Sequence, residues 1–417
     1  MREMKDSGIE WIGQIPKGWE LRRAKTLFTQ RNSKGNGIEV LLSPTQKYGV
    51  VPQSQLEGVV QVKEDTDLQM FKTVHKGDFV ISLRSFQGGF EYSLYEGVCS
   101  PAYQVFYPTS PIYDTYYRYL FKSQSFISKM NNLTVGIREG KNIQYVDFAN
   151  SQIPVPPLAE QERIAAFLDA ECAEIDAVLE KTRASIEEYK KLKQAVITQA
   201  VTKDIRGDRP MKDSGIEWIG DIPAEWSVVL FSKFARVSAN LVDPSDYQDY
   251  LQVSPENIEK DSGKLLPCKT VSEVGVESWN HFFHKGQILY SKIRPKLNKV
   301  CIAPFDGLCS ADMYPIDTDN ISKFVVYTIL SNDFNQQVAM ITENRVKMPK
   351  INQKELSKII VVLPADRMEQ QEIVDYLDGE CGKIDALIAK KQQYLTEIEN
   401  YKKSLIYEYV TGKKEVV

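Results

Sequence analysis

The sequence is poor in the residues on which metal sites and acid–base catalysis depend. It has three histidines, and its six cysteines include no Cys-x-x-Cys pair of the kind that binds zinc. His75 and His284 lie in equivalent turns before expected strands, which favours a structural role over metal binding or proton transfer. We expect the cysteines to be reduced, partly buried thiols of a cytoplasmic protein.

Motifs of common enzyme classes are also missing. The sequence contains no GxSxG, HExxH or Rossmann GxGxxG, and the stretch Gly136–Asn142 is one residue short of a phosphate-binding loop. No run approaches the roughly 18 apolar residues that span a bilayer, and the charged start lacks the apolar core of a signal peptide. These absences predict a chain that is not itself an enzyme, holds no metal and does not enter a membrane.

The overall composition is typical of a soluble globular protein, with 42% hydrophobic and 26% charged residues. A length of 417 residues exceeds what one core organises and suits two domains with connecting elements. The net charge of −4 argues mildly against nucleic-acid binding, which usually leaves a basic footprint. That average hides an uneven distribution, because acidic residues are plentiful in the expected helices.

A long internal repeat is the most informative feature of the chain. Met4–Pro16 reads MKDSGIEWIGQIP and Met211–Pro223 reads MKDSGIEWIGDIP, so twelve of thirteen residues match. Trp19 and Trp226 follow in register, and we call these two stretches the frame segments. A repeat of this length indicates two copied domains and not a solenoid of short units.

The repetition resumes further along each half, and the stretches between diverge. Residues 24–145 and 231–350 share only scattered identities, and we call them the two fillings. The chain is therefore a duplicated frame with two different fillings. The matching downstream residues are Glu160, Gln161, Ile164, Leu168, Asp169, Glu171, Cys172, Ile175, Asp176 and Ala177 in the first half and Glu369, Gln370, Ile373, Leu377, Asp378, Glu380, Cys381, Ile384, Asp385 and Ala386 in the second.

Two long segments carry the apolar spacing of a coiled-coil helix, alternating by four and three residues over more than four heptads. Prolines precede both segments and end the strand before each helix. A single helix of this kind would expose an apolar stripe, so each needs a partner, of which its twin in the same chain is the simplest. The alternative is that each helix packs separately on its own domain. The seam positions are Leu168, Cys172, Ile175, Leu179, Thr182, Ile186, Tyr189, Lys193, Val196 and Ala200, and Leu377, Cys381, Ile384, Ile388, Lys391, Leu395, Ile398, Lys402, Leu405 and Tyr409.

The fillings have the pattern of mixed α/β domains. Short β-rich runs at 78–83 and 287–291 each follow a Lys-Gly turn, and the apolar spacing over 113–130 and 323–340 predicts helices. The aromatic residues between Tyr113 and Phe121 are either a base-stacking platform or helix core, and their helical spacing favours core.

Basic clusters survive in both fillings at corresponding places, which favours phosphate contact over a merely solvated surface. Residues 22–34 contain five lysines and arginines and no acid. The second half has two further basic runs: one is Lys292, Arg294, Lys296 and Lys299, and the other is Arg345, Lys347 and Lys350. In the first half, Arg84, Arg138 and Lys141 lie near the positions equivalent to these runs.

With these residues the sequence resembles the specificity (S) subunit of type I restriction–modification enzymes along nearly its whole length. The GIEWIG motif at Gly8–Gly13, followed by Ile15-Pro16 and Trp19, carries the resemblance in both copies. The junction Ile153–Ile164, IPVPPLAEQERI, leads into a long helix and is a specific signal. The second junction, Leu363–Gln370, departs from this pattern because it lacks the double proline and inserts residues.

The resemblance implies two globular α/β target recognition domains, each reading one half of a split DNA sequence, joined by two long helices that form an antiparallel intramolecular coiled coil. The expected segments are 1–157 and 204–364 for the recognition domains and 158–203 and 365–412 for the spacer helices. It further implies binding of double-stranded DNA and of two methyltransferase (M) subunits, which carry S-adenosylmethionine and methylate adenine. Restriction subunits with ATP-driven translocation can join this complex, and the S subunit is non-catalytic, with no cofactor of its own.

The residues lead independently to a compatible arrangement. Nearly identical frames suit two copies of one partner in a pseudo-twofold arrangement, whereas different fillings suit two unlike half-sites. The first seam covers 33 residues, or ~50 Å, so domains at opposite ends could engage half-sites about one DNA turn apart.

Within the fillings we expect phosphate contacts from basic residues and base contacts from a few polar side chains. Two alternatives stay open: a coiled-coil adaptor between proteins without a DNA role, and a self-contained DNA methyltransferase or nuclease. The absence of a cofactor loop and of an Asn/Asp-Pro-Pro-aromatic motif counts against a self-contained methyltransferase or nuclease. The expected DNA-contacting residues are Tyr48, Arg84, Gln87, Arg138 and Lys141 in the first domain and Lys292, Arg294, Lys296, Lys347 and Lys350 in the second.

Overall fold

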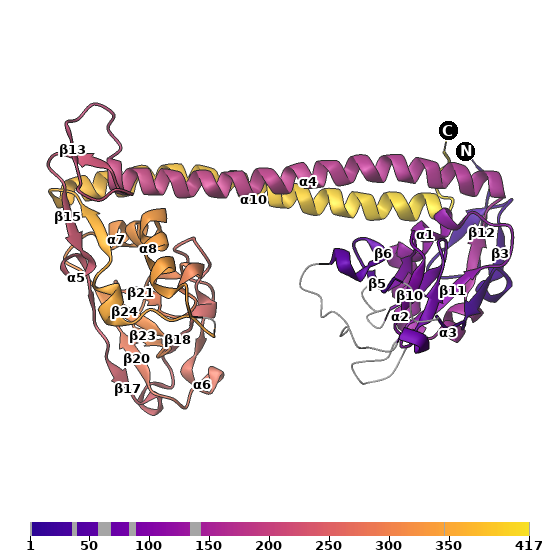
Figure 1. Ribbon diagram of the computed structural model, residues 1–417, viewed down its shortest axis with the longest axis horizontal. Coiled ribbons are helices and arrows are strands. Elements are labelled where there is room, and N and C mark those ends of the chain that lie inside the picture. Colours follow the sequence, from indigo (N-terminus) through magenta and orange to yellow (C-terminus); the bar gives the residue numbers. More distant parts are fainter. Residues whose placement is uncertain are drawn as a thin grey trace. The chain divides into compact units, whose positions relative to one another are not determined.

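The structure, a computed structural model, describes residues 2–35, 40–56, 68–82, 89–133, 143–345 and 347–416 (Figure 1). Its contacts divide the chain into two units. Unit 1 consists of Met1–Thr182 and Tyr394–Val417, and unit 2 of Arg183–Gln393. The two long helices each contribute to both units, because the division runs through the middle of each helix. The four-segment division expected from the sequence therefore stays a prediction.

Unit 1 is organised around a four-stranded antiparallel sheet of order β4-β11-β8-β9, shown in indigo and purple in Figure 1. Phenylalanines fill its core, and Phe79 stacks on Phe106 at 5.3 Å while meeting Phe121 of α1 edge-on. The strands of unit 1 are β1 (Met4–Asp6), β2 (Gln14–Pro16), β3 (Glu20–Arg23), β4 (Phe28–Arg31), β5 (Leu42–Thr45), β6 (Gly49–Pro52), β7 (Lys72–Val74), β8 (Phe79–Ile81), β9 (Phe90–Tyr92), β10 (Gly97–Cys99), β11 (Gln104–Pro108) and β12 (Gln152–Val155). Its helices, apart from the two long ones, are α1 (Asp114–Lys122), α2 (Gln124–Leu133) and α3 (Tyr145–Asn150).

Unit 2 repeats this plan with a sheet of order β16-β24-β21-β22 and adds a five-stranded sheet of order β17-β20-β23-β18-β19. Its core is mainly aliphatic. The strands are β13 (Met211–Asp213), β14 (Asp221–Pro223), β15 (Ser227–Leu230), β16 (Arg236–Val237), β17 (Leu241–Val242), β18 (Leu251–Val253), β19 (Lys269–Thr270), β20 (Asn280–Phe283), β21 (Ile288–Ser291), β22 (Val300–Ile302), β23 (Gly307–Cys309), β24 (Met313–Asp317) and β25 (Ile360–Leu363). The short helices are α5 (Phe231–Phe234), α6 (Val271–Val274), α7 (Ser322–Leu330), α8 (Asn332–Thr342) and α9 (Gln353–Leu356).

The frame segments form the same hairpin in both units. Strands β1 and β2 pair with Met4 opposite Pro16, and β13 and β14 pair with Met211 opposite Pro223. In each unit the next strand pairs with the strand that precedes a long helix, β3 with β12 and β15 with β25. The repeated sequence thus marks the part of each unit that receives the helices.

The two long helices are α4 (Leu158–Lys203) and α10 (Arg367–Val410). The amide of Glu160 donates to the carbonyl of Pro157 in the first turn of α4, and the Asp366 carboxylate accepts from the amide of Glu369 at the start of α10. Beyond α10, Gly412 adopts a left-handed φ of 70°, and a side chain at this position would collide with the Pro16 ring.

Burial along these helices confirms the predicted seam. In α4 eight of the ten seam positions are buried and two are half-buried, and in α10 all ten are buried or half-buried. The pairing is antiparallel within each unit: in unit 1 the Phe167 and Tyr409 rings are in contact, with centroids 4.4 Å apart, and Asp176 binds Lys402 at 2.6 Å. In unit 2 Lys193 binds Asp385 at 2.8 Å.

The helices also pack on the unit cores. Each long helix therefore has both of the expected partners, its twin helix and its own domain. Leu168 and Ile175 belong to the same buried cluster as the sheet of unit 1, and Leu377 and Cys381 belong to the cluster of unit 2. Pairing with the twin helix therefore covers one apolar stripe of each long helix, and packing on the unit core covers a second.

The stretches 113–130 and 323–340 are helical, as predicted, but neither is one continuous helix. Each is broken into two, at Ser123 and at Ser331, where the serine takes an extended conformation. The hydroxyls donate to the carbonyls of Leu120 and Thr328, which gives the preceding helix ends a local partner. Apolar spacing continues across the break, so it could not reveal the bend.

Candidate nucleic-acid interface and partner surface

The expected basic residues of unit 2 come together in one place. Lys292, Arg294 and Lys296 follow β21 in a loop that ends at β22. The amide of Arg294 donates to the carbonyl of Pro349 at 2.8 Å, and Ile293 forms an antiparallel bridge with Lys350. Two basic runs about fifty residues apart in sequence thus lie side by side, and we call them the basic patch.

The cations of the basic patch differ in how freely they can meet a ligand. Arg294, Lys296 and Lys347 are exposed. Lys292 is half-buried with its ammonium 5.3 Å from the centre of the Tyr314 ring, and Lys350 binds Asp312 at 2.9 Å. Arg294, Lys296 and Lys347 are therefore the better placed for phosphate, because Lys292 and the exposed Lys350 already have partners.

A buried imidazole lies beneath this patch. Burial lowers the pKa of His281, and the Lys292 ammonium lowers it further. The ring is therefore neutral at pH 7, which disfavours a charge-based contact by His281.

In unit 1 only one of the five expected DNA contacts falls on described residues. Tyr48 lies in the turn between β5 and β6, is 60% exposed, and has the Lys47 ammonium 4.8 Å from its ring centre. Arg84, Gln87, Arg138 and Lys141 lie outside the described residues.

The basic run over residues 22–34 is less available than its sequence indicates. Arg31 forms two hydrogen bonds, at 2.7 and 3.0 Å, with the buried carboxylate of Asp78 and lies over the Tyr107 ring. Arg22 pairs with Glu20. These contacts assign Arg31 to the unit core and not to a phosphate site.

The aromatic residues of α1 are core, as the helical spacing predicted. Tyr116, Tyr117 and Phe121 are fully buried, and the Tyr116 hydroxyl donates to the carbonyl of Val410 at the end of α10 at 2.7 Å. The base-stacking interpretation is wrong for these three side chains.

The duplicated glutamates tie each frame to a long helix. In unit 1 the Trp19 indole donates to Glu160 at 2.9 Å, and Arg2 binds the same carboxylate at 2.5 Å. In unit 2 Arg209 binds Glu369 and lies over the Trp226 ring. The arginines were missed from the sequence, although each precedes its repeat by two residues and so offered a detectable signal.

The glutamines that follow these glutamates make the same kind of hydrogen bond in the two units. Gln161 accepts from the amide of Tyr113, the residue before α1, at 2.9 Å, and Gln370 accepts from the amide of Ile321, the residue before α7, at 3.0 Å. Each satisfies one amide at a helix start. The repeated Glu-Gln pair therefore anchors the frame and the filling to the same turn of a long helix.

One flank of the helix pair faces the units. Asp169 accepts from the Tyr119 hydroxyl and Asp378 from the Tyr327 hydroxyl, both at 2.7 Å. Burial and the aspartate bond raise the pKa of both tyrosines, so they remain protonated donors.

On the opposite flank of the two helices, five exposed apolar side chains each lie one residue before a seam position. We call this flank the outer face. In unit 1 it presents Val178, Tyr394 and Tyr401, which are 39, 48 and 55% exposed. In unit 2 it presents Leu192 and Leu387, at 49 and 42%. Val178 and Leu387 are equivalent by the repeat, as are Leu192 and Tyr401, so the same helix positions stay uncovered in each copy.

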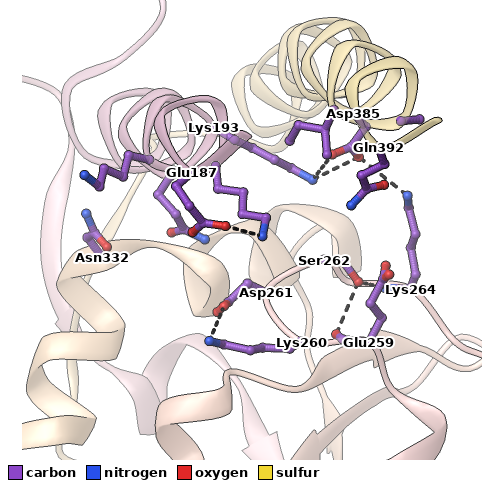
Figure 2. A pocket seen from close by; sticks show the side chains of 15 residues that line it. Glu187, Lys193, Glu259, Lys260, Asp261, Ser262, Lys264, Asn332, Asp385 and Gln392 are labelled. Atoms are coloured by element: carbon purple, nitrogen blue, oxygen red, sulfur yellow. Dashed lines mark hydrogen bonds and ion pairs between the residues drawn. The ribbon is translucent and has the colours of Figure 1, made fainter. Parts of the chain in front are cut away.

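A cleft of about 620 Å³ opens in unit 2 between the helix pair and the loop at 259–264 (Figure 2). Five lysines and four carboxylates line it, and they pair: Lys190 binds Glu187 at 2.7 Å and Lys193 binds Asp385. Lys264 approaches Asp385 from the loop at 3.6 Å. The charges nearly balance, which disfavours a polyanion here.

The described residues contain no group of three metal-ligating side chains and no helix long and apolar enough to cross a membrane. Their six cysteines are free thiols. The described part of the chain therefore offers no site at which a metal ion would be expected.

Comparison with known proteins gives one family. The sequence profile of the type I restriction modification DNA specificity domain matches residues 16–188 and 238–400. The type I restriction enzyme EcoDI specificity subunit of Escherichia coli is 34% identical over 296 residues, 66% of this chain and 65% of that protein. The putative type I restriction enzyme MjaX specificity subunit of Methanocaldococcus jannaschii is 24% identical over 97% of this chain and 96% of its own length.

The match to EcoDI thus spans just under two thirds of that relative. A solved chain from work on complex assembly and conformational transition of the type I R-M system aligns over 96% of this chain and 99% of its own, with a TM-score of 0.70 and 16% identity. At this identity the likeness establishes a shared fold.

Proposed function

The chain belongs to the type I restriction modification DNA specificity family, and we propose that it reads a two-part DNA site with its two fillings and carries two copies of a methyltransferase subunit. The observation that carries this proposal is the contrast within the chain. The frames form the same hairpin and the repeated glutamines make the same contact in both units, whereas the fillings present different surfaces.

The basic patch supports DNA contact by the second filling. Backbone bonds between the 292–299 loop and residues 349–351 bring cations from two runs together, and Arg294, Lys296 and Lys347 have no carboxylate partner among the described residues. Such a cluster suits phosphates, whose contacts position a protein on DNA, while neighbouring polar groups read base edges. Tyr48 is the corresponding candidate in unit 1. Arg84, Gln87, Arg138 and Lys141 remain predictions.

The outer face supports two copies of one protein partner. Exposed apolar residues at heptad spacing favour a helical partner laid along the helix pair, and the repeat supplies equivalent positions twice. We propose that each methyltransferase subunit docks there and brings S-adenosylmethionine, while this chain performs no chemistry. Restriction subunits would join through that complex. Free cysteines throughout the described chain support a cytoplasmic location.

Lys296→Ala tests the phosphate assignment. Loss of one phosphate contact should weaken binding to all duplexes alike and reduce the slope of log K against log salt concentration by about one. Filter binding of specific and random duplexes across a salt series measures both quantities. Lys233→Ala, at an exposed lysine of α5, is the matched control and should change neither. A variant that instead changed which base is preferred would contradict the assignment.

A further inference from the structure

Two charged residues interrupt the apolar seam at equivalent places. Lys193 in α4 and Lys402 in α10 are 209 positions apart, the same offset that relates the other downstream repeats. Lys193 is only 8% exposed, although lysine is rarely buried unless it is paired. A leucine would bury more apolar surface at either position, so stability alone does not account for the lysines.

Each lysine binds an aspartate of the facing helix. In unit 2 the Lys193 ammonium contacts both carboxylate oxygens of Asp385, at 2.8 and 2.9 Å (Figure 2). In unit 1 the Lys402 ammonium contacts Asp176 at 2.6 Å. The residue numbers of the partners add up to 578 in both pairs, so one antiparallel register satisfies both.

The remainder of the seam does not select this register. Most of its residues are aliphatic and recur every heptad, so sliding one helix by seven residues again places apolar side chains opposite apolar side chains. The ion pairs are not periodic in this way. A slide in one direction would set Lys193 opposite Gln392 and Lys402 opposite Arg183, which replaces an attraction by a repulsion.

A slide in the other direction would offer Asp378 to Lys193 and Asp169 to Lys402. Both carboxylates are already engaged, since Asp378 accepts from Tyr327 and binds Lys323, and Asp169 accepts from Tyr119. Neither slipped register therefore supplies two available carboxylates.

We propose that the Lys193–Asp385 and Lys402–Asp176 pairs are positioning residues that fix the register of the helix pair. If the chain reads two half-sites as proposed above, this register sets their spacing, because a one-heptad slide moves a helix by ~10 Å, or about three base pairs. The consequence for DNA rests on the proposed function, but the assignment of the register does not.

Docking of the helix ends on each unit is the competing determinant. Gln161 holds the start of α4 and Tyr116 holds the end of α10 in unit 1, and these contacts alone would also oppose a slide. The experiment must therefore report register directly.

Cys381 provides a native reporter. It lies in the buried cluster of unit 2 against which Val196 packs, and both are seam positions. Val196→Cys should therefore form a disulfide with Cys381 under mild oxidation in the native register. Tyr189→Cys, one heptad earlier, should form it only after the slide that sets Asp378 opposite Lys193. Peptide mapping by mass spectrometry identifies each cross-link in the full-length chain.

In the native background we expect the cross-link from Val196→Cys alone. In a chain that also carries Lys193→Met and Lys402→Met, we expect cross-links from both reporters and a melting temperature below that of the parent, because Asp385 and Asp176 lose their lysine partners. Lys391→Met removes a seam lysine that lies over Tyr189 instead of binding an aspartate, and should leave a single register. The exchange Lys193→Asp with Asp385→Lys should also keep one register.

The proposal is overturned if Tyr189→Cys fails to cross-link in the double-methionine chain while Val196→Cys still does, because end docking would then fix the register. It is also overturned if the double-methionine chain loses cooperative melting, since the lysines would then be needed for folding itself. The assay contains neither DNA nor a partner. Its failure therefore leaves the DNA-reading proposal intact, and failure of DNA reading leaves the register assignment intact.

Discussion

Units 1 and 2 build the same sheet order from different side chains. Where unit 1 places Phe79, Phe90 and Phe106, the corresponding strand positions of unit 2 hold Ile288, Val300 and Ile316. Apolar pattern and volume thus suffice for this architecture, while individual identities are free to change. The loops on the sheet can then diverge, as separate recognition surfaces require.

In the frames, unlike in the sheets, the same residues recur in both units. Trp19 and Trp226, with Glu160 and Glu369, occupy the same places, and the two Glu-Gln pairs contact the same structural elements. Here the same residues recur where polar groups meet across a buried junction, although Glu160 accepts from the Trp19 indole whereas Glu369 binds Arg209. The comparison therefore separates a part of each unit that tolerates any adequate packing from a part that requires particular atoms.

Removal of the frame glutamates should break this equivalence most strongly. Glu160→Ala leaves the buried Trp19 indole without its acceptor and should cost about 1–3 kcal/mol. Glu369→Ala should cost less, because Arg209 keeps Asp204 and Glu225 and the Trp226 indole has no acceptor to lose. Hydrogen exchange of peptides from β3 and β15 measures each unit separately. Equal losses would contradict the described difference.

Removal of the glutamines should show the equivalence directly. Gln161→Ala and Gln370→Ala each leave one helix-start amide without its acceptor, and both should cost about 1 kcal/mol. Denaturant unfolding of the two variants gives the comparison. A loss in one unit alone would show that the repeated glutamines are not equivalent.

A buried ion pair in unit 1 should give a smaller, pH-dependent difference. Burial raises the pKa of Glu91 from 4.5 to about 7, although the Lys122 ammonium opposes the shift. Because the pKa of Glu91 is higher in the folded than in the unfolded chain, Glu91 contributes its full stabilisation of the fold below pH 4.5. This contribution to the free energy of unfolding declines as the pH rises through 7. Cys301 takes its place in unit 2, where burial raises the thiol pKa to about 12.

Melting of the parent and of Glu91→Gln between pH 4.5 and 7.5 checks this expectation. As the pH rises over this range, unit 1 of the parent should lose stability relative to unit 1 of Glu91→Gln. The stability of unit 2 should change equally in the parent and the variant. A parent and a variant with parallel pH profiles would contradict the raised pKa.

The sequence predicted the scaffold better than the recognition surface for a physical reason. A heptad seam is a local, periodic signal, and burial at Leu179, Ile186 and Ile384 follows directly from it. The break at Ser123 was missed because a serine that bonds its own helix end leaves the apolar spacing unchanged.

The candidate site was only partly predictable. Proximity of Lys292 and Arg294 to residues 349–351 depends on a backbone pairing between segments distant in sequence, which charge patterns cannot reveal. Arg31 looked available for phosphate because its partner Asp78 lies 47 residues away. Base contacts depend on loop geometry, so Tyr48 and Arg294 remain predictions.

One measurement tests the central claim most directly. In a chain whose second filling, residues 231–350, is replaced by a copy of the first, 24–145, both units should read the same half-site. Adenine-methylation mapping in cells that supply the methyltransferase subunit should then show the first half-site twice, in inverted orientation, as the proposed pseudo-twofold arrangement implies. Retention of the parental two-part motif would contradict the assignment of sequence reading to the fillings.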